Sequence, residues 1–257
     1  MILTIDIGNT NILLGCFKGN ELVFRERISS KREATDLEYA AMIKTALDMY
    51  TLTPQQIDGA IMASVVPTIT NTLKRAIEKL IGIETLVVGP GIKSGLSIRI
   101  DNPAQLGADL VAGAVGALEE YTMPCVVIDM GTASTISVLD ENGTFLGGAI
   151  AAGVRLTLKA LTANTSQLPS IPIEAPKSVI GTNTVECMQS GLVYGTASMI
   201  DGLLDKIEDE LGETPTFFAT GGLSKEIIAH CRKNIIYNEN LLLEGLKAIY
   251  EKNNQPI

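Results

Sequence analysis

The sequence predicts an α/β protein built from two copies of one domain. Short apolar runs of strand composition alternate with segments of helical periodicity, which indicates sheets that contain parallel strands and are flanked by helices. One block of buried strand, Asp-x-Gly with polar residues, strand, tight turn and strand occurs twice. Its aspartates, Asp6 and Asp129, lie 123 residues apart (129 minus 6) in a chain of 257. We therefore expect one domain over residues 1–117 and a second over 118–257, each with a mixed sheet.

The first copy opens with the strand "MILTI", which Asp6 ends. It continues through "IGNT", the strand "ILLGCF", a turn at "KGN" and the strand "ELVFRERI". Residues 35–38, "TDLE", form a capping box, and apolar residues follow at helical spacing as far as Tyr50. "TPQQ" at 53–56 predicts another helix start. Two buried strands, "IDGAIMASVVP" and "IETLVVG", then enclose the helix "TNTLKRAIEKLIG".

The second copy repeats this order from the strand "PCVVI", which is followed at once by Asp129. "MGTAST", the strand "ISVL", a turn at "ENG" and the strand "TFLGGAI" come next. Beyond them we expect a long helix from about Val185 to Leu211, which Thr184 is well placed to cap. The strand "TFFATGG" and a terminal helix "LLLEGLKAIYEKN" complete the chain.

The composition argues against nucleic acid as a partner and against a membrane span. A net charge of -9 and a pI near 4.7 offer no basic surface for phosphates. The apolar stretches fall short of the roughly 20 residues that span a bilayer, and no basic-then-apolar leader begins the chain, so we expect a cytoplasmic protein. The single histidine, His230, is expected at a helix end or on the surface. The scattered cysteines are expected as reduced thiols, at Cys16, Cys125, Cys187 and Cys231.

Each Asp-x-Gly hairpin could bind phosphate or could merely turn the chain. At the open edge of an α/β sheet, the glycine and polar residues could donate to a phosphate while Asp6 holds a Mg²⁺. One hairpin alone would be interpreted as a turn. Two copies favour phosphate binding, because a pair of such hairpins makes a cleft for a polyphosphate between two similar domains.

Six motifs occur in order along the chain: "DIGNTN", "SVVP" (64–67), "VVGPGIKSGL" (87–96), "DNPAQLGAD" (101–109), "DMGTAST" and "GTNTVECMQSGLVYG" (181–195). Together they resemble the type III pantothenate kinases. The paired hairpins and "ATGG" (219–222) also resemble the acetate and sugar kinase, heat-shock chaperone and actin superfamily. The resemblance covers nearly the whole chain. It implies two ribonuclease H-like, actin-like ATPase domains, phosphorylation of pantothenate by ATP in the first step of coenzyme A biosynthesis, and a homodimer with active sites near the subunit interface.

The resemblance also implies a role for each matching residue. Asp109 would be the catalytic base that takes the proton of the pantothenate hydroxyl. A monovalent cation, K⁺ or NH₄⁺, would lie beside Asp129, and Asp6 would hold the Mg²⁺ that accompanies ATP. ATP and its phosphates would contact Asp6, Ile7, Gly8, Asn9, Thr10, Asn11, Ile12, Leu13, Gly131, Thr132, Thr220, Gly221 and Gly222. Pantothenate would contact Ile100, Gly107, Ala108, Asp109, Leu110 and Thr184.

Asp109 can also be interpreted from the residues alone. "NPAQ" at 102–105 predicts a helix start, with an apolar stripe that Asp109 borders. Gly113 and Gly116 on the same side would leave room for a ligand. A carboxylate there could act as a general base, or it could be a solvated helix aspartate. The stripe consists of Leu106, Leu110, Ala114 and Leu118.

The chain differs from the family pattern in four places. Leu110 replaces an arginine expected to bind the pantothenate carboxylate, Ile100 replaces a tyrosine, "AAG" (151–153) replaces "TPG", and Leu37 replaces an acid. A missing arginine partner costs roughly 2–3 kcal/mol, or about 30- to 150-fold in affinity. Two alternatives stay open: a pantothenate kinase that binds the carboxylate through Arg155 or a partner subunit, or a nucleotide-binding relative with another acceptor or no catalysis. An actin-like filament protein is a third class.

Overall fold

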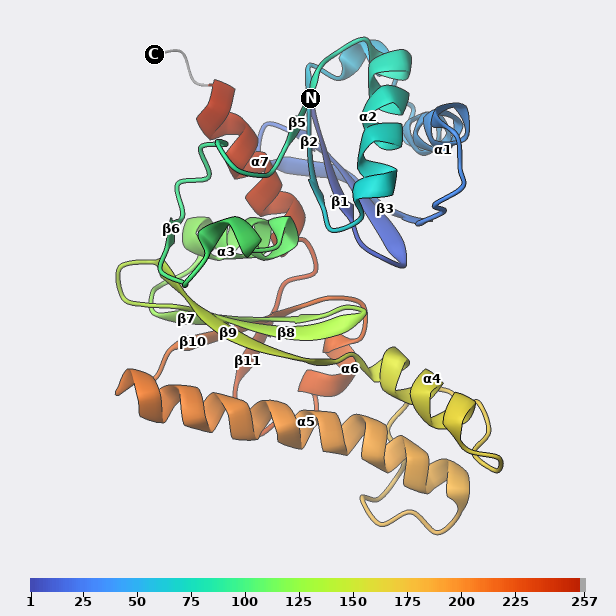
Figure 1. Ribbon diagram of the computed structural model, residues 1–257, viewed down its shortest axis with the longest axis vertical. Coiled ribbons are helices and arrows are strands. Elements are labelled where there is room, and N and C mark those ends of the chain that lie inside the picture. Colours follow the sequence, from blue (N-terminus) through green and yellow to red (C-terminus); the bar gives the residue numbers. More distant parts are fainter. Residues whose placement is uncertain (255–257) are drawn as a thin grey trace. The chain divides into compact units, whose positions relative to one another are not determined.

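The structure, a computed structural model, describes residues 1–254 and divides into two compact units (Figure 1). Unit 1 contains Met1–Leu96, Asp101–Glu120 and the described residues from Asn240 to Asn254, and unit 2 contains Ser97–Ile100 and Tyr121–Glu239. The C-terminal helix thus folds into unit 1, although the sequence division groups it with residues 118–257. The division after residue 117 stays a prediction about the sequence repeat, whereas the two units are defined by which residues pack together.

A five-stranded mixed sheet forms the centre of unit 1, in the order β3-β2-β1-β4-β5. β1 pairs antiparallel with β2 and parallel with β4, as a hairpin followed by a helical crossover requires. The elements are β1 (Ile2–Ile7), β2 (Asn11–Lys18), β3 (Glu21–Ser29), α1 (Asp36–Met49), the 3₁₀ turn η1 (Pro54–Gln56), β4 (Gly59–Ser64), α2 (Pro67–Ile81), β5 (Thr85–Val87), the 3₁₀ turn η2 (Pro103–Gln105), α3 (Ala108–Glu120) and α7 (Leu241–Asn254).

Helices cover both faces of this sheet. α1 and α2 pack against the alternate residues of β1 from Leu3 to Ile7, which point to one face. α3 and α7 pack on the other face, against Ile61 and Ala63 of β4. α1 begins with the predicted capping box, in which Thr35 and Glu38 each accept the backbone N–H of the other. Local and tertiary signals therefore agree here.

Glycines let α3 and α7 cross at close range. A Cβ on Gly116 would overlap the carbonyl of Leu241, and a Cβ on Gly245 would overlap the carbonyl of Ala112. This crossing draws the C-terminal helix into unit 1. The expectation that Gly113 and Gly116 leave room for a ligand is wrong, because Gly113 is buried and α7 fills the space beside Gly116.

Unit 2 contains a six-stranded mixed sheet in the order β11-β10-β7-β8-β9-β6. Five of its strands repeat the unit 1 sheet: β9, β8 and β7 are antiparallel neighbours, and β10 and β11 continue in parallel. The predicted duplication is thus visible in the topology, and β6 is an additional edge strand. The elements are β6 (Ser97–Ile98), β7 (Cys125–Met130), β8 (Ala133–Leu139), β9 (Thr144–Ala152), α4 (Val154–Asn164), α5 (Thr184–Leu211), β10 (Thr216–Thr220), α6 (Ser224–Ile228) and β11 (Ile235–Tyr237).

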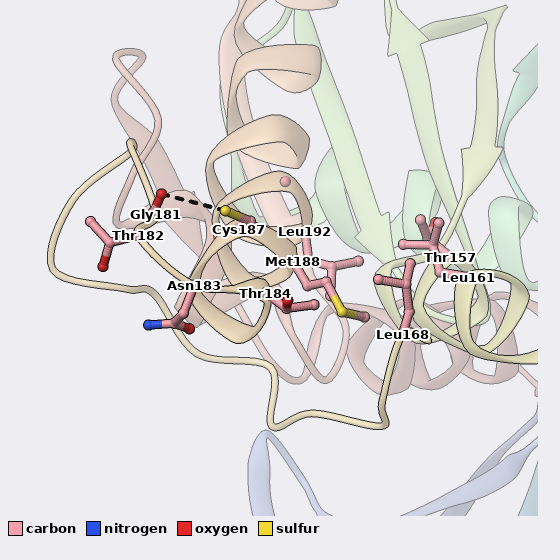
Figure 2. Close-up of a pocket in the computed structure, with 11 residues that line it drawn as sticks. Thr157, Leu161, Leu168, Gly181, Thr182, Asn183, Thr184, Cys187, Met188 and Leu192 are labelled. Carbon is pink, nitrogen blue, oxygen red and sulfur yellow. Dashed lines mark hydrogen bonds between the residues drawn. The ribbon is translucent and has the colours of Figure 1, made fainter. Parts of the chain in front are cut away.

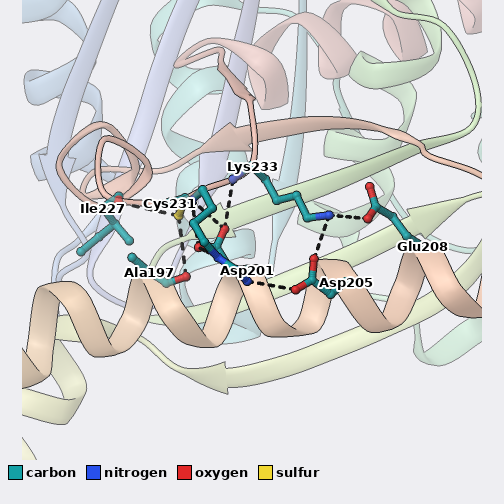
Figure 3. Close-up of polar contacts among 8 residues, drawn as sticks. Ala197, Asp201, Asp205, Glu208, Ile227, Cys231 and Lys233 are labelled. Carbon is teal, nitrogen blue, oxygen red and sulfur yellow. Dashed lines mark hydrogen bonds and ion pairs between the residues drawn. The ribbon is translucent and has the colours of Figure 1, made fainter.

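The long helix α5 is held by apolar packing and by an ionic network. Figure 3 shows the network, which joins α5 to the segment after α6. The Asp201 side chain is only 4% exposed and accepts the backbone N–H groups of Arg232 and Lys233 at 2.9 and 3.2 Å. Lys233 also pairs with Asp205 and Glu208. The two N–H groups replace the water that the Asp201 carboxylate loses on burial, so residues 232–233 are fixed on α5.

Three local predictions need correction. The helix start at 53–56 is a single 3₁₀ turn. The helix predicted from 102–105 is interrupted, because Leu106 is extended (φ -65°, ψ 126°) and α3 begins only at Ala108. The cap of α5 is Asn183, whose side chain accepts a first-turn N–H at 3.0 Å, and Thr184 is the first helical residue.

The remaining sequence predictions concern single residues and the membrane. His230 is exposed just after α6, with its ring edge-on to Tyr194 at 5.0 Å, which confirms the helix-end position. All four cysteines are free. Burial raises the pKa of the Cys125 thiol to about 12, so this side chain packs as a small apolar group. Among residues 1–254, no helix combines the length and apolarity that a bilayer crossing needs.

Candidate functional site

Loop 1, from Gly8 to Thr10, joins β1 to β2 beside the half-buried Asp6. The Gly8 N–H donates to the Asn11 carbonyl at 3.0 Å, which closes a tight turn. Asn9, Thr10 and Asn11 are exposed. The loop therefore presents polar groups and backbone to solvent next to a carboxylate.

Other residues predicted for this site lie in the strands. Ile7 and Ile12 are fully buried in the core of unit 1, and Leu13 is half-buried on β2. The side chains of Ile7 and Ile12 serve packing. Only the backbone at these two positions can contact a ligand.

Loop 2, Gly131 and Thr132, joins β7 to β8 in the same manner, and both residues are exposed. Asp129 is half-buried near the end of β7, and its parallel partner on β10 is Thr220. The next residue, Gly221, has a φ of +98°, and a Cβ there would lie 2.7 Å from Asp129 Oδ1. Unit 2 thus brings Asp129 and the "TGG" turn together, and only glycine fits at the point where they meet.

In each unit, the residue that follows the third strand, β3 or β9, is hydrogen-bonded to the loop between the first two strands. The Ser30 N–H donates to the Thr10 carbonyl at 3.0 Å, and the Gly153 N–H donates to the Thr132 carbonyl at 3.2 Å. Ser30 Oγ also donates to the Gly8 carbonyl at 2.6 Å. Ser30 was not predicted from the sequence, because a serine at a strand end forms no motif. Aligning it with Gly153 through the repeat is the signal that could have found it.

Asp109 lies in the first turn of α3, in unit 1. Its Oδ1 accepts the Leu110 N–H at 2.8 Å, and a Cβ on Gly107 would overlap the same oxygen. Burial raises the pKa of Asp109 above its ordinary value, while the backbone N–H groups of Leu110 and of Asp109 itself lower it in part. A half-buried carboxylate with a raised pKa is suited to accept a proton.

The positions that differ from the family pattern are divided between the units. Leu110 is half-buried in α3, next to Asp109 and Ala108, and Ile100 is half-buried after β6 in unit 2. Arg155 lies exposed on α4 and lines a cavity of about 360 Å³ together with Lys159. A positive charge is therefore available in unit 2, while the helix position beside Asp109 is apolar.

Thr184 lines a cavity of about 690 Å³ at the beginning of α5 (Figure 2). Apolar side chains from α4 and α5 line the cavity with one from the intervening loop, and polar groups come from α4, from the turn that precedes α5 and from the first residue of α5. Because the helix N-terminus carries a partial positive charge, this cavity suits a ligand with an apolar body and a polar end. The apolar lining includes Leu161, Leu168, Met188 and Leu192, and the polar lining includes Thr157, Thr182, Asn183 and Thr184.

Single carboxylates, rather than clusters, are the available metal ligands. Within residues 1–254, no group of three or more His, Cys, Asp or Glu side chains could hold a metal ion. Mg²⁺ is commonly bound by one or two carboxylates together with substrate phosphates, so Asp6 fits an ion that arrives with a nucleotide. The carboxylate of Asp129, beside the backbone of Met130 and Gly221, provides the oxygen chemistry that suits a hard monovalent cation.

Comparison with known proteins identifies relatives over almost the whole chain. A family model described as type III pantothenate kinase matches residues 2–206. The type III pantothenate kinase of Halalkalibacterium halodurans is 40% identical over 253 residues, which cover 98% of this chain and 100% of the relative.

Solved structures share the fold. A protein assigned to the Baf family of transcriptional activators, from Campylobacter jejuni, has a TM-score of 0.63 and 20% identity, with 98% of both chains covered. A protein assigned as a 2-dehydro-3-deoxygalactonokinase, from Sinorhizobium meliloti, has a TM-score of 0.63 and 10% identity, with 100% of this chain and 98% of the other covered. These likenesses concern the fold alone, and they confirm the predicted class of two mixed sheets flanked by helices.

Proposed function

The chain belongs to the type III pantothenate kinase family, and from that membership we propose which of its residues carry the activity. It is an ATP-dependent kinase that phosphorylates pantothenate in coenzyme A biosynthesis. One observation supports the residue assignments most: the same strand, loop and strand frame occurs in both units, with Asp6 and Asp129 at equivalent positions.

Both loops contribute to binding ATP in this proposal. Gly8 to Asn11 and Gly131 with Thr132 donate backbone and side-chain groups to the phosphates, while Ile7, Ile12 and Leu13 shape the strands around them. The "TGG" turn at residues 220–222 contacts the nucleoside. Exposure of the loops and the absence of a Cβ on their glycines support close approach of backbone N–H groups to an anion.

The two proposed cation sites are each assigned to one carboxylate. Asp6 holds the Mg²⁺ that accompanies ATP, and a monovalent cation, K⁺ or NH₄⁺, binds beside Asp129. A bound Mg²⁺ supplies charge neutralisation on the phosphates, which a carboxylate alone would repel. Each carboxylate thus has a different cation to hold.

Asp109 acts as the general base. Its carboxylate takes the proton of the pantothenate hydroxyl, and the oxygen then bonds to the γ-phosphorus as the bond to ADP breaks. Burial and the raised pKa of Asp109 support this role, because they favour the protonated product of the step. Gly107 leaves the carboxylate free of a neighbouring side chain.

Pantothenate binds through groups other than an arginine beside Asp109. Gly107 and Ala108 approach it by backbone, Ile100 and Leu110 by apolar contact, and Thr184 by its hydroxyl. Thr184 lies among the polar lining of the 690 Å³ cavity, whose other walls are apolar. Arg155 on α4, or a residue of a partner subunit, pairs with the carboxylate.

A homodimer in the cytoplasm completes the proposal. Gly191 and Gly195 are exposed on α5, and a Cβ on either would meet nothing within 4 Å. Val179, Ile180 and Val185, near the start of the same helix, are exposed apolar side chains. An open helix face of small residues beside an apolar patch is suited to a second copy of the chain.

The test is an assay with ATP, Mg²⁺, K⁺ and pantothenate. We expect phosphopantothenate from the wild-type chain and none from Asp109→Ala. If the wild type forms no product yet binds ATP, the protein is instead a nucleotide-binding relative with another acceptor. Light scattering that rises on addition of ATP would indicate a filament protein.

A further inference from the structure

Ser30 makes two hydrogen bonds to loop 1. It is the first residue after β3, and it is half-buried. Ser30 Oγ donates to the Gly8 carbonyl at 2.6 Å, and the Ser30 N–H donates to the Thr10 carbonyl at 3.0 Å. One residue therefore binds a carbonyl at each end of the loop.

A loop that binds phosphate has to keep its carbonyl oxygens away from the anion. The partial negative charge of a carbonyl repels phosphate, whereas an N–H group attracts it. The carbonyl of Asn11 is occupied by the Gly8 N–H at 3.0 Å, and those of Gly8 and Thr10 are occupied by Ser30. These three bonds fix the direction of the peptide groups in loop 1 before any ligand binds.

The segment that carries Ser30 is itself anchored in the core. Tyr39 on α1 is fully buried, and its hydroxyl donates to the Lys31 carbonyl at 2.8 Å and accepts the Lys31 N–H at 2.9 Å. Lys31 directly follows Ser30. A continuous chain of contacts thus runs from the α1 core through residues 30–31 to the loop.

Unit 2 provides an internal comparison. Gly153 occupies the position of Ser30, and its only bond to loop 2 is the one from its backbone N–H to the Thr132 carbonyl at 3.2 Å. A Cβ on Gly153 would overlap that carbonyl and lie 2.5 Å from the Gly131 carbonyl, so no side chain fits there. The hydroxyl link is therefore specific to loop 1.

We propose that Ser30 is a positioning residue for ATP, which sets loop 1 in its phosphate-binding shape through the hydroxyl bond to Gly8 and is held in place by Tyr39. The inference rests on the proposed role of loop 1 in binding ATP. Ser30 contacts loop residues and not the reacting atoms, so its loss weakens nucleotide binding without abolishing the chemistry.

Ser30→Ala removes the hydroxyl bond and keeps the backbone bond. We expect the KM for ATP to rise about fivefold to tenfold, the range for one ordinary hydrogen bond. The KM for pantothenate stays close to the wild-type value, and the thermal midpoint falls only by the few degrees expected for the loss of one hydrogen bond. Ser30→Thr retains the hydroxyl and restores the KM for ATP. Ser29→Ala, at an exposed neighbouring serine, is the matched control and leaves the KM for ATP unchanged.

A role in stability alone would give the opposite pattern. The inference is overturned if Ser30→Ala lowers the thermal midpoint but changes the KM for ATP less than twofold, or if Ser30→Thr is as impaired as Ser30→Ala. If Ser30→Ala does not fold, Tyr39→Phe replaces it, with an expected rise of about twofold to threefold in the same KM. An unchanged value there overturns the proposal.

Asp6→Asn separates this inference from the proposed function. If Asp6→Asn impairs ATP use and Ser30→Ala does not, only the role of Ser30 fails. If Asp6→Asn also leaves ATP use unchanged, the assignment of loop 1 to ATP fails, and the role of Ser30 fails with it.

Discussion

Loop 1 and loop 2 occupy equivalent places in two copies of one frame, but they are stabilised by different means. Loop 1 has three residues between its strands and is held by a side chain, through Ser30 Oγ and the Gly8 carbonyl. Loop 2 has two residues and is held by close packing of glycines, at Gly153 and Gly221. Duplication therefore preserved where each aspartate and loop stand, while the means of fixing them diverged.

The difference also affects what each aspartate can do. Asp129 lies against the backbone of Gly221, within a crowded turn of unit 2. Asp6 borders loop 1, in which Asn9 and Thr10 are exposed. We infer that Asp6 is the carboxylate available to a metal that arrives with substrate, and that Asp129 serves a cation that remains in the fold.

Replacing each aspartate by asparagine, in two separate variants, is expected to have the largest effect on activity. Asp6→Asn should lower kcat by about 100-fold, because Mg²⁺ loses its carboxylate and the phosphate charge is no longer neutralised. Asp129→Asn should instead weaken the activation by added K⁺, and kcat should fall about tenfold at saturating Mg²⁺. Initial rates over a matrix of Mg²⁺ and K⁺ concentrations distinguish the two. Equal dependence on both cations in both variants would contradict the division of roles.

The position after the third strand should tolerate change in unit 1 and not in unit 2. Gly153→Ala places a Cβ against two carbonyls and should destabilise the protein by about 2–4 kcal/mol. Ser30→Gly removes one hydrogen bond and should cost about 1 kcal/mol. Urea unfolding measures both. Gly89→Ala, where a Cβ would meet nothing within 4 Å, is the control. A Gly153→Ala variant as stable as the control would show that the packing of loop 2 is not needed.

Leu110→Arg should change the binding of pantothenate and not the binding of ATP by the two loops. A guanidinium beside Asp109 could pair with the pantothenate carboxylate and lower the KM for pantothenate about tenfold. The KM for ATP should not change, because neither loop is altered. Leu110→Met keeps the volume without the charge and is the matched control. If the KM for pantothenate does not fall, the carboxylate already has its cation elsewhere, as proposed for Arg155 or a partner subunit.

The smallest expected effect is on the pH profile. A base must be deprotonated to act, so activity falls as the pH drops through the pKa of Asp109. Since burial raises that pKa, the acid limb of kcat/KM should lie above the ordinary aspartate value of about 3.9. Loop variants such as Ser30→Ala should keep this limb. An acid limb that moves with changes in loop 1 or loop 2, and not with changes at Asp109, would assign it to another group.

The repeat was predictable because its signals are local. Asp-x-Gly at a strand end and a glycine in each tight turn are carried by a few adjacent residues, so both hairpins could be placed from the sequence. Asn183 and Thr184 are neighbours and both are good N-cap residues, so the sequence could not show which of them caps α5. The structure selects Asn183.

Other features depend on contacts between distant residues. The place of α7 is decided by Gly116 and Gly245, which are far apart in sequence and which meet only once α3 and α7 cross. The interruption before α3 places Asp109 in a first turn, over Gly107, which periodicity could not show. Ser30 is similar, because its importance depends on which carbonyls face it.

In the proposed mechanism, this chain transfers the γ-phosphate of ATP to pantothenate with Asp109 as base. The most direct test compares the wild type with Asp109→Asn in two measurements, phosphopantothenate formation and ATP binding. We expect product from the wild type, a loss of about 100-fold or more in the rate of Asp109→Asn, and unchanged ATP affinity in that variant. Its thermal midpoint should not fall, because a carboxyl whose pKa is raised by burial costs stability above its ordinary pKa. Wild-type rates in Asp109→Asn, or no product from the wild type, would contradict the proposed mechanism.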